Sequence, residues 1–146
     1  MAIAIFSVAI LSAMGIFNMA IEGQRSALAA QNLQESIRYG LEMMSKEIRM
    51  AKKDSGTCPA ADDNKVYTTN GPQDELNFRN INDKCVKYYL GSNRIKVDRG
   101  TDTGYLTPDE VRINKLIFNV VDDGVAYEQS RVTILIEAEA VGKEMH

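Results

Sequence analysis

Few residues of this chain have the types and spacing that catalysis needs. His146 is the only histidine among 146 residues, which removes His-based triads and His-rich metal sites. Cys58 and Cys85 are the only cysteines, and two cysteines without a second pair do not make a structural zinc site. The sequence contains no glycine-rich phosphate loop. It therefore predicts a chain that is not an enzyme and that holds no cofactor and no metal ion.

Three short acidic runs carry oxygen ligands of the kind that Ca²⁺ prefers. They are Asp62-Asp63-Asn64, residues 98–102 and Asp122-Asp123. None has the ligand spacing of an EF-hand loop, and Asp and Asn are favoured in turns because their side chains bond the local backbone. Solvated turns are the prediction, and calcium binding is the alternative.

Charge is distributed unevenly along the chain. The net charge is −3 with no block of basic residues, so nucleic acid is not an expected partner. Residues 1–21 contain no charged residue, and Glu22 opens a segment that is dense in charge. About 20 apolar residues cross a bilayer core as a helix, so residues 1–21 are predicted to be a membrane span. The residues expected to face lipid or neighbouring helices are Ile3, Ile5, Phe6, Val8, Ile10, Leu11, Ile16, Phe17 and Ile21.

Two other interpretations of the apolar segment fit the sequence less well. A secretory signal peptide carries a basic n-region and a shorter apolar core, whereas no Lys or Arg precedes Arg25 here. A core helix that is apolar on all sides belongs in a large domain, and this chain makes one small domain. The length and the composition favour the membrane span.

Helix-forming residues continue beyond the apolar segment. No proline occurs before Pro59, and residues 22–53 are mostly strong helix formers. We expect one helix from about residue 2 to about residue 53, with Gly56 as the C-cap. The amphipathic stalk segment comprises residues 22–55, which contain the second half of this helix. Its apolar stripe lasts barely two heptads, too short to favour a coiled-coil dimer, so it is predicted to pack on the rest of the chain. The stripe consists of Leu33, Ile37, Leu41, Met44 and Ile48.

Residues 56–146 alternate short β-forming runs with turn formers. Residues 85–90 and 94–98 are separated by Gly91-Ser92-Asn93, which indicates a β-hairpin. Further strands are expected at residues 76–78, 116–121 and 131–139. The predicted fold class is therefore α+β, a long N-terminal helix packed on one face of a small antiparallel sheet of about four to five strands.

The two cysteines are expected to pair. If the first segment spans a membrane, the sheet domain lies on the oxidising side, where disulfides form. A Cys58–Cys85 bond would stabilise the fold by roughly 3–3.5 kcal/mol through the loop that it closes. Two unpaired thiols in a reducing compartment are the alternative.

Several sequence segments in the predicted helix and strands resemble those of a known protein family. In the helix they are the uncharged segment, Gln31-Asn32-Leu33-Gln34-Glu35, Arg38-Tyr39 and Met44-Ser45-Lys46-Glu47-Ile48-Arg49-Met50-Ala51. In the strands they are Tyr88-Tyr89-Leu90, Asn93-Arg94-Ile95, Leu116-Ile117-Phe118 and Arg131-Val132-Thr133-Ile134. Together they resemble the type IV pilin-like family, closest to the J-type minor pseudopilins of type II secretion and the similar minor type IV pilins.

This resemblance implies a function in protein transport or filament assembly. The chain would be a minor pilin or pseudopilin that helps to initiate or cap a type IV pilus-like filament or a type II secretion pseudopilus. Family members begin with a basic leader that ends in Gly, followed by Phe-Thr-Leu-Ile-Glu. This sequence begins inside the apolar segment, so we assign no processing residues.

The resemblance also implies a location and a set of partners. The chain would cross the bacterial inner (cytoplasmic) membrane once, with its globular domain periplasmic or extracellular. Its partners would be other pilins or pseudopilins in a hetero-oligomeric tip complex, the inner-membrane assembly machinery, and membrane lipid before assembly. Two rival hypotheses are a single-span, membrane-anchored extracytoplasmic binding or adhesion module and an enzyme of unrecognised type.

Overall fold

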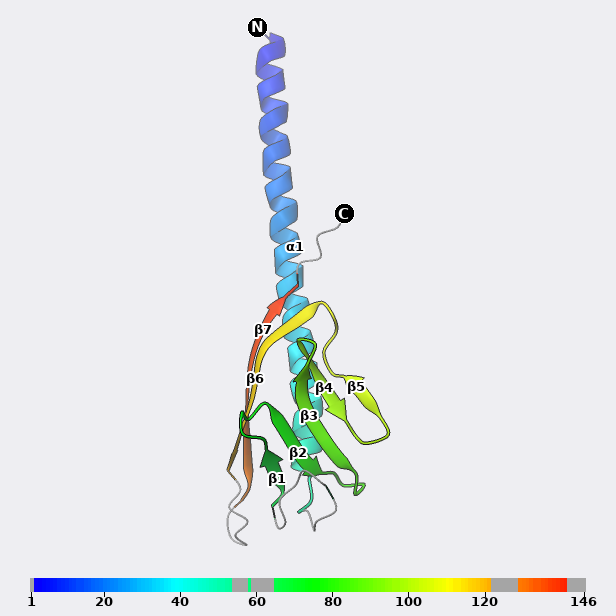
Figure 1. Cartoon of the computed structure of the whole chain (residues 1–146). Coiled ribbons are helices and arrows are strands. Elements are labelled where there is room, and N and C mark those ends of the chain that lie inside the picture. Colours follow the sequence, from blue (N-terminus) through cyan, green and yellow to red (C-terminus); the bar gives the residue numbers. More distant parts are fainter. Residues whose placement is uncertain (1, 54–57, 59–64, 122–128, 142–146) are drawn as a thin grey trace.

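One long helix stands on a group of short strands (Figure 1). This computed structural model describes residues 2–53, 58, 65–121 and 129–141, and within the helix it leaves out the side chains of residues 2–9, 11 and 12. The elements are α1 (Ala2–Arg49), β1 (Tyr67–Thr69), β2 (Glu75–Arg79), β3 (Cys85–Gly91), β4 (Arg94–Asp98), β5 (Thr103–Tyr105), β6 (Val111–Val121) and β7 (Arg131–Ala140). A long helix packed on antiparallel strands confirms the predicted α+β class.

The helix ends earlier than the predicted residue 53 because a tertiary contact replaces its last turn. The N–H groups of Met50 and Ala51 donate to the carbonyl oxygens three residues back, at 3.2 and 3.0 Å, which tightens the end of the helix. The N–H of Lys52 then donates to the carbonyl oxygen of Arg79 at 2.8 Å, so the chain joins β2. The expected C-cap, Gly56, lies outside the described residues.

The strands form two sheets rather than the single sheet of four to five strands that the sequence predicts. The first is a five-stranded antiparallel sheet in the order β1-β2-β3-β4-β5, and the second is the antiparallel pair β6-β7. Strands β1 and β5 were not predicted, because three residues are too few to show an alternating pattern. Strand β6 stays outside the first sheet because its N–H groups at Ile113 and Phe118 donate at 2.8 Å to carbonyl oxygens of two turns, Asn93 and Gln73.

The predicted hairpin is present with a tighter turn. Gly91 pairs with Arg94, so only Ser92 and Asn93 form the loop, and their φ angles are 55° and 57°. Two central residues with positive φ match the twist of the flanking strands, as in type I′ hairpins. A Cβ at Gly91 would lie 2.7 Å from Cδ of Lys96, so a larger residue there would displace this flexible side chain. The glycine thus leaves room for the Lys96 side chain on the outer face of the sheet.

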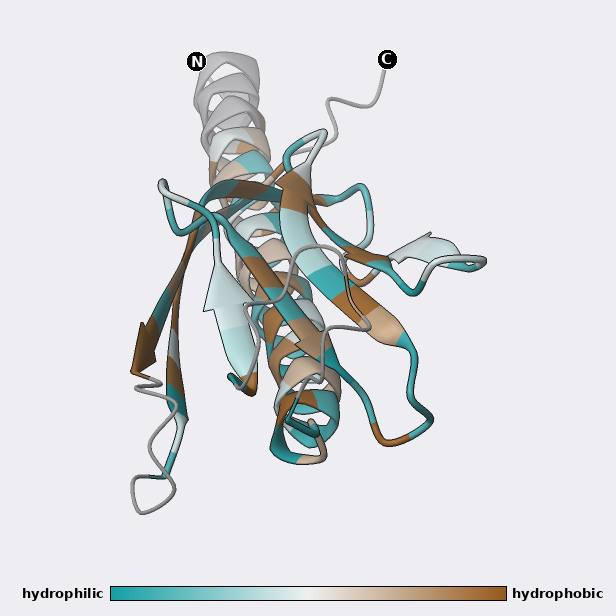
Figure 2. Ribbon diagram, turned by 60° about the horizontal axis from the view of Figure 1, so that its bottom comes forward, coloured by the Kyte–Doolittle hydropathy of each residue, from teal (hydrophilic) through white to brown (hydrophobic). Residues whose placement is uncertain are grey.

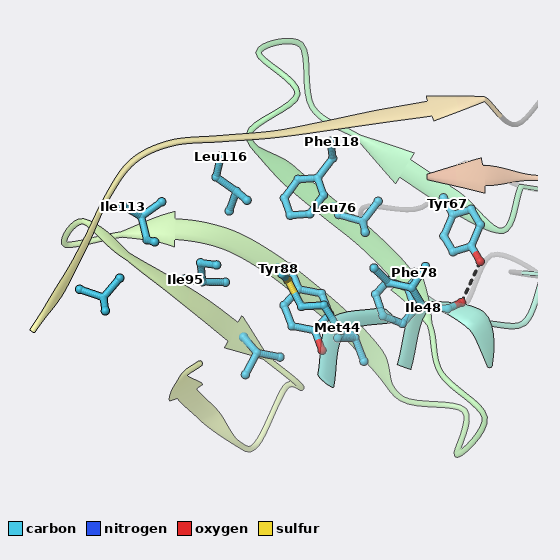
Figure 3. Close-up of a cluster of buried hydrophobic side chains, with 13 residues drawn as sticks. Met44, Ile48, Tyr67, Leu76, Phe78, Tyr88, Ile95, Ile113, Leu116 and Phe118 are labelled. Atoms are coloured by element: carbon cyan, nitrogen blue, oxygen red, sulfur yellow. Dashed lines mark hydrogen bonds between the residues drawn. The ribbon is translucent and has the colours of Figure 1, made fainter. Parts of the chain in front are cut away.

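The core lies between the C-terminal half of α1 and the inner faces of both sheets (Figure 3). The predicted stripe faces this core: Met44 and Ile48 are buried, and Leu33, Ile37 and Leu41 are partly buried against it. The hydroxyl of Tyr67 donates to the carbonyl oxygen of Ile48 at 2.7 Å, which satisfies one acceptor at the end of the helix. The fully buried rings and aliphatic chains include Phe78, Tyr88, Leu76, Ile95, Ile113 and Phe118.

A disulfide joins the segment after the helix to the start of β3. The Cα atoms of Cys58 and Cys85 lie 5.5 Å apart, and their sulfur atoms are bonded. The predicted pairing of the two cysteines is therefore confirmed. Along the strands, hydrophobic and hydrophilic residues alternate, as a sheet with one covered face requires (Figure 2).

Candidate functional site

The N-terminal half of α1 carries large apolar side chains that the fold leaves uncovered. Figure 1 shows this half projecting away from the strands. Six such side chains are 41% to 74% exposed. They are Ile10, Met14, Ile16, Phe17, Met19 and Leu28, and we call them the apolar helix surface.

The apolar helix surface is not confined to one side of α1. Ile10, Met14 and Phe17 follow one another at steps of four and three, so they share a face, whereas Ile16 and Met19 lie off that face. A helix that is apolar on several sides is stable in water only when other apolar groups surround it. Burying one such side chain contributes about 1.5–3 kcal/mol, so covering the set would be strongly favourable.

The structure places the predicted span residues as follows. Ile10, Ile16 and Phe17 are exposed, and Ile21 is partly buried. The side chains of Ile3, Ile5, Phe6, Val8 and Leu11 lie outside the described part of the chain. Among the residues that are described, no helix is both long enough and apolar enough to cross a membrane.

A polar cluster that the sequence did not reveal fixes α1 to the sheet. The carboxylate of Glu47, on the helix, accepts two hydrogen bonds from the guanidinium of Arg99, at 2.8 and 3.1 Å. It also accepts a short hydrogen bond from the hydroxyl of Tyr88 and one from the amide of Asn80 at 3.3 Å. We call these four residues the Glu47 cluster. Their sequence separations of 33 to 52 residues hide them from local patterns.

The charge state of the Glu47 cluster follows from its contacts. Burial raises the pKa of Glu47, but the hydrogen bonds from Arg99, Tyr88 and Asn80 outweigh it and hold that pKa below its ordinary value. Burial and the hydrogen bond to Glu47 raise the pKa of Tyr88, and the hydrogen bond to Glu47 raises that of Arg99. The cluster is therefore a fixed ion pair with a neutral tyrosine, an arrangement suited to holding two elements together rather than to proton transfer.

The outer face of the five-stranded sheet presents tyrosines beside cations. Strand register aligns Tyr89, Lys96 and Tyr105 across β3, β4 and β5. The Lys96 ammonium lies 4.7 Å from the Tyr105 ring centroid, and the Arg94 guanidinium lies 4.0 Å from it. Because these cations already contact rings of their own sheet, the row stabilises the sheet by cation–π contacts.

The acidic runs give no metal site within the described residues, where no group of three or more His, Cys, Asp or Glu side chains is placed to hold an ion. Asp98 uses its carboxylate to accept the N–H of Gly100 at 2.8 Å, as the turn interpretation expects. The runs at residues 62–64 and 122–123 lie outside the described residues.

The chain matches no known family model, no curated protein and no solved structure.

Proposed function

We propose that this chain is a minor pilin-like or pseudopilin-like subunit that helps to initiate or cap a filament of the type IV pilus or type II secretion kind. The observation that carries the proposal is the apolar helix surface, which projects beyond the sheet domain and is covered by no described part of the chain. Exposed apolar area of this extent is unfavourable in water, so lipid or another apolar protein surface is expected to cover it.

Two environments would cover the apolar helix surface in turn. Residues 1–21 carry no charge, so lipid of the inner membrane would surround them before assembly, with the sheet domain outside the cytoplasm. In the filament, the helices of neighbouring subunits would replace the lipid. Because both environments are apolar, the transfer changes little hydrophobic free energy, and an assembly machine would drive it in either direction.

The sheet domain would then select the partners. The Glu47 cluster and the core hold the sheet in a fixed orientation on α1, so packing of the helices also fixes where each sheet domain lies. Contacts between sheet domains of different minor subunits would decide which subunits meet at the tip. The disulfide is consistent with a domain outside the reducing cytoplasm.

A charge placed on the apolar helix surface tests the proposal. In cells that naturally produce the chain, Phe17→Asp should remove it from the sheared filament fraction and from complexes with other pilin-like proteins. The matched control is Gln24→Asp, which puts the same charge on an exposed polar position of the same helix and should leave assembly unchanged. Formation of the Cys58–Cys85 bond in both variants shows that the sheet domain has folded. Normal assembly of Phe17→Asp, or a monomeric wild-type chain that binds a small molecule or surface polymer, would refute the proposal.

A further inference from the structure

Among the strands that the structure describes, β7 has one unpaired edge. It is ten residues long and pairs with β6 on one side only. The sequence RVTILIEAEA contains neither Lys nor Pro, and the bulge of this hairpin lies in β6, between Ile113 and Lys115. These are devices by which proteins commonly protect an edge strand from pairing with another chain. Strand β7 has none of these three devices, although it carries the charged residues Arg131, Glu137 and Glu139 and contacts α1.

The hydrogen-bonding groups of this edge can be assigned from β6. The N–H of Phe118 donates to Gln73, away from β7, so Phe118 and its partner Ile134 form a pair without hydrogen bonds between them. The N–H of Ile113 likewise donates to Asn93, and its partner is Ala138. The main-chain groups of the even-numbered residues of β7 therefore point to the open edge, and among the described residues nothing accepts or donates there.

The side chains of β7 divide into two faces. The even-numbered residues Val132, Ile134, Ile136 and Ala138 pack against the core, and the odd-numbered residues are exposed. Leu135 is 51% exposed and lies at the centre of the exposed row, with Arg131 near one end and Glu139 near the other.

We propose that the β7 edge binds a second copy of this chain, antiparallel and centred on Leu135, to form a continuous sheet β6-β7-β7-β6. Centred on Leu135, Arg131 of each copy lies opposite Glu139 of the other, because the two positions are equally far from the centre. The carboxylate of Glu139 also accepts a hydrogen bond from Arg112 of its own hairpin at 3.4 Å, so it would lie between two guanidinium groups. On the inner face, Ile134 lies opposite Ile136. Both of these residues present their main-chain groups to the open edge, so the backbone register and the charge register agree.

The pairing is self-complementary only in the antiparallel sense. A parallel pair through the same edge would turn one copy by 180° about the strand axis, so the core-facing row of one copy would continue into the exposed row of the other. Strand β7 points toward the N-terminal half of α1 (Figure 1), so antiparallel copies project their helices in opposite directions. Subunits that lie side by side in one filament cannot pair in this way. The inference does not rest on the proposed function, and its failure would leave that function standing.

Disulfide cross-linking of the full chain in mild detergent tests the pairing. The two native cysteines are bonded to each other, so any covalent dimer must form through an added cysteine. With Leu135→Cys, the two new Cβ atoms would lie about 4.5–5.5 Å apart across the dimer, and mild oxidation should give a covalent dimer. The matched control is Thr133→Cys, whose two copies would lie about 13 Å apart along the strands, so that the dimer should form without a covalent cross-link. No dimer with Leu135→Cys, or equal dimer with both variants, would overturn the proposal.

Charge reversal tests the register independently. In the Leu135→Cys background, Arg131→Glu alone or Glu139→Arg alone should lower the dimerisation constant on the order of tenfold, because each change puts two like-charged pairs opposite one another. Mixing the two variants should restore dimerisation as a mixed dimer, in which both pairs are again opposite in charge. Arg131→Glu chains that pair with themselves as well as with Glu139→Arg chains would contradict this register.

Discussion

Replacing Glu47 by Ala should destabilise the fold by about 2–3 kcal/mol. The change removes the acceptor of the hydrogen bonds from Arg99, Tyr88 and Asn80. Breaking a buried ion pair costs about 3–5 kcal/mol, but the side chains of Arg99 and Glu47 are 26% and 16% exposed, so water reaches the released guanidinium and the loss is smaller. The hydroxyl of Tyr88 stays buried without an acceptor, which alone costs about 1–3 kcal/mol.

Urea unfolding followed by the near-ultraviolet circular dichroism of the tyrosines measures this loss. For a domain of this size, 2–3 kcal/mol lowers the midpoint by about 1 M. The control is Glu42→Ala on the same helix, whose carboxylate bonds Arg38 at 3.0 Å with side chains 67% and 81% exposed, and which should cost less than about 0.5 kcal/mol. Equal midpoints for the Glu47 and Glu42 variants would refute the structural role of the Glu47 cluster.

Three further changes have expected outcomes. Because the pKa of Glu47 is lowered from the ordinary value of 4.5 in the folded state, its ionisation stabilises the fold above that pH. The unfolding free energy of the wild-type chain should therefore fall as the pH drops below 4.5, and that of Glu47→Ala should fall less. Equal pH profiles of the two chains would contradict a stabilising charge on Glu47. Met44→Ala should cost about 2–5 kcal/mol in urea unfolding because Met44 is fully buried, whereas Met43→Ala, 41% exposed, should cost well under half of that. Removing the Cys58–Cys85 bond, which closes a separation of 27 residues, should lower the unfolding free energy by about 3.5 kcal/mol, as unfolding with and without a reductant would show; an unchanged midpoint would exclude a stabilising role.

Local patterns predicted the helix, its packing stripe and the longer strands. Met44 and Ile48 lie at helical spacing, and residues 94–98 alternate strictly, so each pattern reports directly which side of its element is covered. The end of the helix was placed too late because residues 50–53 are themselves compatible with a helix. What stops it is the hydrogen bond from Lys52 to Arg79, a contact between distant segments.

The features that sequence patterns missed depend on contacts across the fold. Strands β6 and β7 are separate from the first sheet because β6 forms hydrogen bonds to two turns. No pattern in the sequence predicts these hydrogen bonds. The Glu47 cluster joins residues up to 52 positions apart, so no local pattern marks Glu47 as its centre. Aligned exposed residues such as Tyr89, Lys96 and Tyr105 become visible only once the strand register is known.

The central claim is that α1 packs on the helices of similar subunits, and site-specific photo-cross-linking at Phe17 tests it most directly. A photoreactive residue at this position, which is 66% exposed, is introduced into the full chain in its natural host, and the adducts are identified by mass spectrometry. We predict adducts with the uncharged N-terminal helices of other pilin-like proteins, and no such adducts from the same photoreactive residue placed at Val121 on the β6-β7 hairpin. Adducts with lipid alone, in cells that carry assembled filaments, would contradict it.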